Sequence, residues 1–183
     1  MTKSELVRRA REGDRDAFDT LLTEDIDRLY RIARLILRDF DRAEDAVQEA
    51  LVRCWRDLPS LRDPDRFDAW LNRVLINAIN DEARRKRGVV VNLVHLTIEP
   101  SVADSSATLA DRDEIARVFE RLSVEHRTIV VLHHYLGMTT DEAARAIGIP
   151  PGTAKSRLHY ATGALRAALE ADARSTTEGR ALA

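Results

Sequence analysis

The sequence predicts an all-α fold: two small helical domains joined by a flexible linker. Its 183 residues include only seven Gly and five Pro, too few for the turns of many short strands. Helix-forming Ala, Leu, Arg and Glu are abundant, and apolar residues recur at helical spacing on both sides of residues 88–110, where that period is absent. At 44% hydrophobic and 33% charged residues, the chain is too apolar for full disorder and too charged for a membrane protein.

The sequence also indicates a cytoplasmic protein without membrane insertion. The N-terminus MTKSELVRRAREGD is charged from its start, unlike a signal peptide. No apolar run approaches the roughly 18 residues that a membrane span requires. The chain has one cysteine, Cys54, which excludes an intramolecular disulfide and a Cys-based zinc site and favours a reducing compartment.

The first predicted domain, residues 1–87, consists of amphipathic helices. We expect helical segments at about residues 4–12, 14–23, 29–37, 43–58 and 68–87, with a break near Asp39 and a proline-containing loop at 59–66. Gly88 is expected to end the last of these helices behind its basic final turn, because glycine readily adopts the left-handed conformation after a helix.

We interpret residues 88–110 as the linker and residues 111–170 as a second helical domain. Ser123 offers a helix N-cap, and Gly137 is placed to end that helix near Leu136. Thr139 and Glu142 form a capping box for a short helix that ends at Gly148. A tight turn and a last helix from about residue 153 follow, and the polar tail 171–183 is expected to be disordered.

The short helix, turn and cationic last helix match the helix-turn-helix pattern, whose second helix lies in the DNA major groove. Side chains displaced from the inward apolar set are candidates for contacts with bases and phosphates, because Lys, Ser and Arg bind these groups. They are Thr153, Lys155, Ser156, Arg157, His159 and Tyr160.

Two further polar surfaces lie in the first domain. Asp45, Gln48 and Glu49 share one face of helix 43–58, which is either a solvated face or a docking face for a basic or amide-rich partner. Helix 68–87 carries the amides of Asn72, Asn77 and Asn80 with Arg73, and ends in the basic cluster 84–87. Amides read base edges and cations hold phosphates, so this helix is either a nucleic-acid surface or an ordinary polar face.

No pattern in the sequence predicts an enzyme, a cofactor, a metal site or a small-molecule substrate. A glycine-rich phosphate loop, an H-E-x-x-H motif and a G-x-S-x-G motif are all lacking. The adjacent His133 and His134 point about 100° apart on a helix and are not placed to chelate one ion together. The carboxylates Asp45 and Glu49 lie on an exposed face with no apolar pocket that would raise a pKa for acid–base catalysis.

Taken together, these motifs carry a family resemblance. The stretches Asp45–Glu49 and Phe67–Val74, with Asn77 and the basic cluster 84–87, resemble region 2 of bacterial sigma-70 family factors. Residues 122–127, 137–144 and 152–158 resemble region 4 of the same family. Within this family, the chain resembles the extracytoplasmic-function (ECF) group. The resemblance lies in the order of the motifs, in their separation by a linker and in the lack of the extra regions of larger sigma factors.

The resemblance implies a promoter-specificity subunit that binds core RNA polymerase and directs promoter recognition and DNA melting. In such factors Asp45, Gln48 and Glu49 would dock on the clamp helices of the largest polymerase subunit. The minus-10 element would be bound, as an unpaired strand with an extruded base, by Arg62, Asp63, Arg66, Arg73, Asn77, Asn80, Arg84 and Arg85. The last-helix set from Thr153 to Tyr160 would read the minus-35 duplex, while the second domain also meets the polymerase flap.

Factors of this group are typically held inactive by an anti-sigma factor, so the resemblance implies such a partner. With one cysteine and no Cys–His cluster, a redox or zinc sensor would lie in that partner. The alternatives from other classes are a free-standing helix-turn-helix repressor or activator, an enzyme acting on nucleic acid, and a structural helical scaffold. A dimeric repressor would require a heptad seam and an effector pocket, which residues 1–110 lack.

Overall fold

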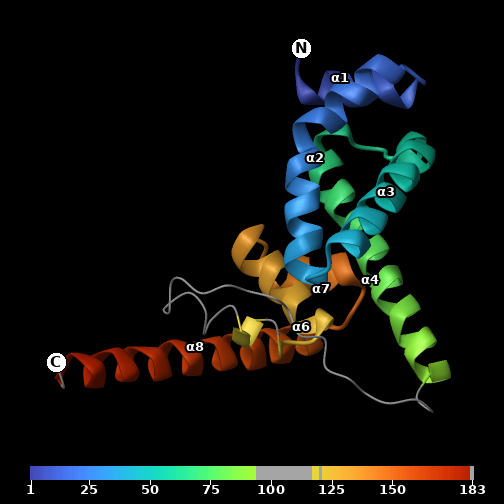
Figure 1. Ribbon diagram of the computed structural model, residues 1–183. Helices are drawn as coiled ribbons and strands as arrows, with labels where there is room; N and C mark the ends of the chain where they lie inside the picture. The colour runs from blue at the N-terminus through green and yellow to red at the C-terminus, as the bar shows by residue number, and fades with distance from the viewer. Residues whose placement is uncertain (94–116, 120, 182–183) are drawn as a thin grey trace. The chain divides into compact units, whose positions relative to one another are not determined.

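The computed structural model describes residues 1–93, 117–119 and 121–181, and every regular element in these ranges is helical (Figure 1). The all-α prediction is therefore confirmed. The chain divides into two compact units, the first formed by Met1–Gly88 and the second by most of the residues that follow.

The first unit begins with α1 (Lys3–Arg11) and α2 (Arg15–Leu37). Thr2 and Asp14 cap the two helices, each accepting a hydrogen bond from a backbone amide three residues later. Residues 14–23 and 29–37, expected as separate segments, form one helix, because residues 24–28 contain no Gly or Pro to interrupt it. It ends at Arg38, whose left-handed φ of 57° breaks the helical path.

The next helix, α3 (Phe40–Asp57), is capped by Asp39, where the sequence predicts the break. Two short 3₁₀ turns, η1 (Leu58–Ser60) and η2 (Pro64–Arg66), form the predicted loop and lead into α4 (Phe67–Leu93). The expected end of this helix at Gly88 is wrong. A glycine inside a helix costs only about 1 kcal/mol, and residues 89–93 contain no proline to stop it. The rest of the expected linker, 94–110, lies outside the described residues.

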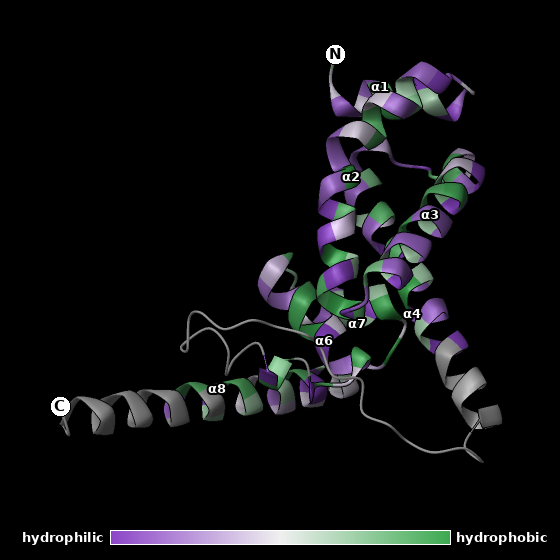
Figure 2. Cartoon of the chain, viewed as in Figure 1, coloured by the Kyte–Doolittle hydropathy of each residue, from purple (hydrophilic) through white to green (hydrophobic). Residues whose placement is uncertain are grey.

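The core of the first unit is formed by the apolar faces of α2, α3 and α4. Figure 2 shows hydrophobic and hydrophilic residues alternating around these helices, as expected for amphipathic helices that share a core. The fully buried side chains from α2 and α4 follow the helical period; they include Leu21, Leu29, Ile32, Ile36, Leu71, Leu75, Ile76 and Ile79. Each buried side chain of this size stabilises the fold by about 1.5–3 kcal/mol, so the pattern fixes which helix faces point outward.

The lone cysteine of the chain, Cys54, belongs to this core. Its side chain is fully buried on α3. Burial raises the pKa of the Cys54 thiol to about 12, and the negative charges of Asp25 and Asp57 act in the same direction. The thiol is therefore protonated at neutral pH and packs as a small apolar group.

The second unit contains α6 (Val124–Val130), a π-helical turn η3 (Val131–Tyr135), α7 (Thr140–Ile147) and α8 (Pro151–Ala181). Ser123 caps α6 as predicted, and the capping box at Thr139 and Glu142 is formed in both directions. The predicted helix up to Leu136 is present, but its last turn is widened to π geometry before Gly137, with φ of 67°, ends it.

The last helix, α8, is longer than the sequence indicates. It starts at Pro151 rather than near Thr153, because proline fits the first helical turn, where its missing amide hydrogen costs nothing. The expectation of a disordered tail from residue 171 is wrong, since α8 runs to Ala181. Residues 171–177 contain neither Gly nor Pro, so their polar composition does not interrupt the helix.

Candidate functional site

The polar face of α3 is the first candidate surface. Asp45 and Gln48 are exposed, and the Gln48 amide donates to Glu44 Oε1 at 3.3 Å. Glu49 is less exposed than these two residues: it is half-buried, and its Oε1 accepts a hydrogen bond from Arg53 Nε at 2.7 Å. Asp45 and Gln48 are therefore available to a partner, whereas Glu49 is already engaged by its own helix.

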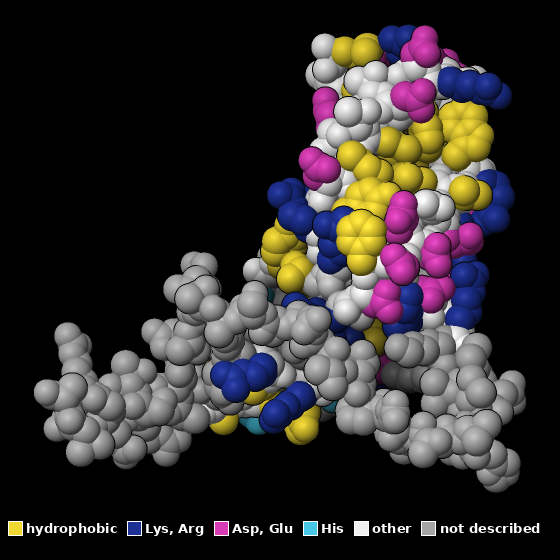
Figure 3. Space-filling view, in the orientation of Figure 1, with side chains coloured by type: hydrophobic (Ala, Val, Ile, Leu, Met, Phe, Trp, Pro, Cys, Tyr) yellow, Lys and Arg dark blue, Asp and Glu magenta, His cyan; other side chains and the backbone are white. Residues whose placement is uncertain are grey.

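Two exposed apolar side chains, Val52 and Trp55, share this face. They are 61% and 39% exposed, and helical spacing places them beside Gln48. The Trp55 ring packs edge-on against Phe18, with centroids 4.8 Å apart, so it is held in place while part of it remains accessible. Figure 3 shows hydrophobic side chains over α2 and α3 with Asp and Glu beside them. Sequence reasoning missed this mixture, because Trp55 fits the buried stripe by spacing.

The loop between α3 and α4 carries Arg62, Asp63 and Arg66, all exposed. The Asp63 carboxylate caps η2 by accepting from the backbone amide of Asp65, and it pairs with Arg66 Nε at 3.3 Å. The loop thus has a defined turn at its centre and exposed cations on either side of it.

The outer face of α4 carries the other predicted residues. Arg73 and Asn77 are exposed and Asn80 is half-buried. Asn72, which the spacing also placed on this face, is 8% exposed, because its Oδ1 accepts from Arg28 Nη1 at 2.6 Å. Asn72 is therefore a structural residue and was wrongly grouped with the exposed amides.

Further along α4, the exposed cations Arg84 and Arg85 lie near acidic residues of the same helix. Arg84 Nη1 lies 3.5 Å from Asp81, and Arg85 Nη1 lies 3.3 Å from Glu82. The two guanidinium groups are themselves 77% and 65% exposed, so water screens both ion pairs and each group remains able to exchange a carboxylate for a phosphate.

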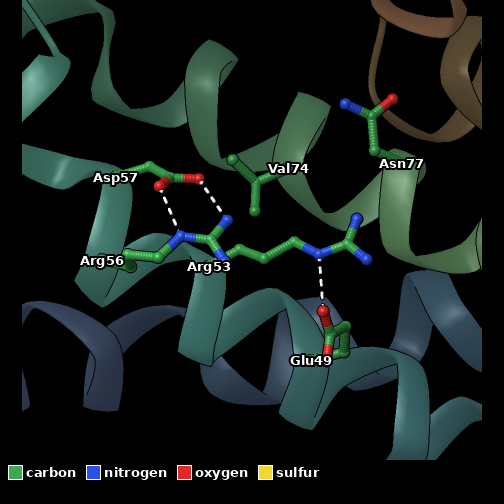
Figure 4. A pocket seen from close by; sticks show the side chains of 6 residues that line it. All are labelled: Glu49, Arg53, Arg56, Asp57, Val74 and Asn77. Carbon is green, nitrogen blue, oxygen red and sulfur yellow. Dashed lines mark hydrogen bonds and ion pairs between the residues drawn. The ribbon is translucent and has the colours of Figure 1, made fainter.

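A pocket of about 320 Å³ opens between α3 and α4 (Figure 4). Arg53 crosses it from α3 and bridges Glu49 to Asp81, whose Oδ2 lies 2.8 Å from Arg53 Nη1. Arg56 pairs with Asp57 in two hydrogen bonds of 2.7 and 2.9 Å, which lower the pKa of Asp57 and keep its carboxylate charged. The lining residues are Glu49, Arg53, Arg56, Asp57, Val74 and Asn77.

This pocket therefore offers fixed donors and acceptors around the small apolar patch of Val74. Of its lining, sequence reasoning found Glu49 and Asn77 and missed Arg53, Arg56 and Asp57. The signal that would find them is their spacing: Glu49, Arg53 and Arg56 follow one another at i, i+4 and i+7 on the side of α3 that meets α4.

In the second unit, α8 presents a row of exposed polar side chains. Lys155, Ser156, His159 and Tyr160 are exposed, while Thr153 and Arg157 are half-buried. The opposite side of the helix is anchored by buried alanines, Ala154 and Ala161. The Tyr160 ring lies 4.8 Å from the His126 ring of α6, so it is positioned although 63% of it is exposed. With α7 and the turn before it, α8 forms a helix-turn-helix.

Within residues 1–93, 117–119 and 121–181, no group of three or more His, Cys, Asp and Glu side chains has the arrangement that would hold a metal ion. His133 instead uses Nδ1 to contact the Met138 carbonyl at 2.7 Å. Among the helices in the described part of the chain, none combines the length and apolar character needed to cross a bilayer.

Both units match models of known protein families. Residues 21–89 match Sigma-70 region 2, and residues 112–165 match Sigma-70, region 4. The first match contains the α3 face, the loop, most of α4 and the pocket, and the second contains the helix-turn-helix. The two matches together cover well over half of the chain.

Individual relatives agree with these matches. The chain is 41% identical over 146 residues to the ECF RNA polymerase sigma factor SigL of Mycobacterium tuberculosis, covering 78% of this chain and 82% of that protein. It is 38% identical over 144 residues to the RNA polymerase sigma-E factor of Streptomyces avermitilis, covering 79% of this chain and 80% of that one.

Solved structures agree as well. The sigma factor RpoE from Bartonella quintana, crystallised with the anti-sigma factor NepR, has a TM-score of 0.66 and 25% identity, covering 84% of this chain and 96% of that one. CnrH in complex with the cytosolic domain of CnrY has a TM-score of 0.64 and 27% identity, covering 93% of this chain and 98% of that one. The chain therefore belongs to the sigma-70 family of RNA polymerase sigma factors, in its ECF group.

Proposed function

We propose that this sigma factor divides promoter recognition between its two units. The first unit docks on core RNA polymerase and captures the melted minus-10 element, and the second reads the minus-35 duplex. The observation that carries this proposal is that one chain has two such surfaces. They are an acidic, partly apolar face on α3 and a row of exposed side chains on α8 suited to reading bases. A free-standing DNA-binding protein needs the second feature but not the first.

The α3 face supports docking on the clamp helices of the largest polymerase subunit. Asp45 and Gln48 supply charge and hydrogen bonding, while Val52 and Trp55 supply apolar area that is otherwise left in water. Aromatic and apolar side chains at the centre of an interface carry most of its binding energy, and polar groups around them set the register. Glu49 lies at the edge of this surface, where it lines the pocket and anchors Arg53.

The pocket between α3 and α4 is the place we propose for the extruded minus-10 base. Its fixed donors and acceptors suit the edge of a base, and Arg73 with Asn77 lies beside it on α4. Arg62, Asp63 and Arg66 of the loop, with Asn80, Arg84 and Arg85 of α4, would hold the flanking bases and the phosphates. Capturing a base that duplex DNA keeps stacked joins recognition to strand opening in one event.

On α8 we propose a conventional major-groove contact with the minus-35 element. Lys155 and Ser156 reach base edges, and Thr153 and Arg157 lie where phosphate oxygens approach the start of the helix. Tyr160 is held against His126, so its ring meets the groove in one orientation. The remaining surface of this unit would meet the polymerase flap.

Replacing both Lys155 and Ser156 with Ala tests this assignment. We expect the preference for the native minus-35 sequence over a mismatched one to fall by roughly thirtyfold or more, because two base-edge contacts are removed and each contributes at least about 1 kcal/mol of discrimination. The measurement is open-complex formation by holoenzyme on matched and mismatched promoters. Arg166→Ala, an exposed cation further along α8, is the control. An equal loss of affinity for core polymerase would contradict the assignment.

We further propose that an anti-sigma factor controls this chain in the cytoplasm. Two solved relatives are in complex with a partner, RpoE with the anti-sigma factor NepR and CnrH with the cytosolic domain of CnrY. The same exposed α3 face that docks on polymerase is a surface such an inhibitor would cover, because occupying it prevents holoenzyme assembly.

Run-off transcription with purified bacterial core RNA polymerase tests the proposed function as a whole. The template is a pool of promoter fragments from the source genome, with and without this protein. Sequence-selective transcripts that require the protein are expected, and their alignment yields both promoter elements. Failure to produce transcripts, together with tight dimeric binding to duplex DNA, would instead identify a repressor or activator.

A further inference from the structure

The first helix, α1, precedes the residues that match sigma region 2 and has no part in the contacts proposed above. It packs on α2 and also contacts η1 and η2, the two turns of the loop between α3 and α4. This is the loop that we propose to contact the minus-10 strand. In Figure 1 it lies at the end of the first unit where α3 is connected to α4. Its side chains are therefore placed to act on the loop.

Lys3, the first residue of α1, joins three elements through one ammonium group. Its Nζ lies 2.8 Å from Asp25 Oδ2 on α2 and 2.5 Å from Asp68 Oδ1 in the first turn of α4. The same nitrogen sits 5.7 Å from the centre of the Phe67 ring. Because the Asp25 carboxylate is only 7% exposed, water screens this ion pair much less than a surface pair.

The neighbouring residue, Ser4, holds the other side of the same junction. Its hydroxyl donates a hydrogen bond to Asp65 Oδ1 in η2. Asp65 lies between Asp63 and Arg66, two of the loop residues proposed to contact the minus-10 strand. The adjacent side chains of Ser4 and Lys3 thus contact the end of the loop and the start of α4, and Lys3 also connects this junction to α2 through Asp25.

We propose that Lys3 is a positioning residue for minus-10 recognition. It fixes the geometry of the loop Leu61–Arg66 against the start of α4, so that the unpaired base meets its contacts without prior rearrangement. This inference rests on the proposed minus-10 role of the loop. Binding constellations must be held to about 0.5 Å to be effective, and the contacts to Asp65 and Asp68 fix the end of the short loop where it enters α4.

The test uses holoenzyme assembled with the Lys3→Met variant. Binding is measured by fluorescence anisotropy on a single-stranded oligonucleotide that carries the minus-10 sequence returned by run-off transcription, and on one with a substituted base. We expect roughly tenfold weaker binding to the native sequence and reduced discrimination between the two oligonucleotides, with unchanged affinity for core polymerase. Lys3→Arg, which keeps the charge, is expected to restore most of the discrimination.

Two further variants keep the test decisive. Arg8→Met, on the same helix, removes an exposed pair with Glu5 and is expected to leave both oligonucleotide affinities unchanged. Asp68→Asn removes one of the two Lys3 ion pairs at an exposed carboxylate, so it preserves the fold and is expected to lose discrimination in the same direction.

Unaltered discrimination in both Lys3→Met and Asp68→Asn would overturn the inference. Equal losses of minus-10 binding and of core-polymerase affinity would also overturn it, because they would show a general defect in the unit. If the wild-type holoenzyme itself does not distinguish the two oligonucleotides, the proposed minus-10 role of the loop fails, and the inference fails with it.

Discussion

Replacing Asp45 and Gln48 together with Ala is expected to weaken the binding of core RNA polymerase by roughly 30- to 150-fold, with no change in unfolding temperature. Both side chains are exposed, so their removal exposes no core and leaves no buried group unpaired. The expected loss is that of truncating two interface residues, at about 1–1.5 kcal/mol each. Competition against a labelled wild-type sigma factor for a limiting amount of core enzyme measures it.

The matched control is Glu5→Ala, which removes one negative charge from an exposed position on α1. It separates loss of a specific contact from a general change in the charge of the first unit. Val52→Ala and Trp55→Ala extend the test to the apolar part of the face. If the Asp45/Gln48 double variant competes as well as the wild type, the polymerase-docking role of this face is excluded.

Replacing Asp25 with Ala is expected to destabilise the first unit by about 2 kcal/mol and to lower its unfolding temperature by on the order of 10 °C. Asp25 is 5% exposed and binds Lys3 Nζ and Arg28 Nη2, each at 2.8 Å. Its removal leaves two cations facing each other without the carboxylate that neutralised them. The cost stays at the lower end for a buried pair because the Lys3 side chain remains 35% exposed.

The free energy that Asp25 contributes to the stability of the first unit is expected to depend on pH. Burial alone would raise the pKa of Asp25, but hydrogen bonds from Lys3 and Arg28 outweigh it and hold that pKa below its ordinary value. The stabilisation is therefore present above the unfolded-state pKa of about 3.9 and is lost as the pH falls through the folded-state pKa. Urea unfolding across this range measures it.

The difference between wild type and Asp25→Ala should be constant near neutral pH and shrink below about pH 4. Glu5→Ala is again the control, because a surface ion pair contributes little. A difference that persists unchanged under acidic conditions would show that the effect comes from packing and that the ion pairs contribute nothing.

Much of the fold could be predicted from the sequence, since apolar periodicity and capping residues are local signals. The break at Asp39, the cap at Ser123 and the capping box at Thr139 are all present in the structure. Helix ends were harder, because α4 passes Gly88 and α8 continues to Ala181. Glycine and polar composition weaken a helix without stopping it, and only a competing structure decides where it ends.

The exposure of candidate residues was predicted correctly where a single helix carries them, as with Asp45, Gln48 and the row on α8. They were missed where the chemistry arises between helices. Asn72 has the spacing of an exposed amide, yet its side chain is buried and accepts a hydrogen bond from Arg28 on α2. The pocket around Arg53 likewise needs α3 and α4 side by side, and a single-helix pattern does not contain that information.

The buried position of Cys54 has a practical consequence for following this protein in solution. With its pKa raised to about 12, the thiol is almost wholly protonated at pH 7, whereas an exposed cysteine is thiolate to a few per cent. Maleimide dyes react with the thiolate, so a cysteine introduced at an exposed position would be labelled selectively without removing the native one. Fluorophores on α3 and α8 would then report the separation of the two units, free and in holoenzyme, in an otherwise unaltered chain.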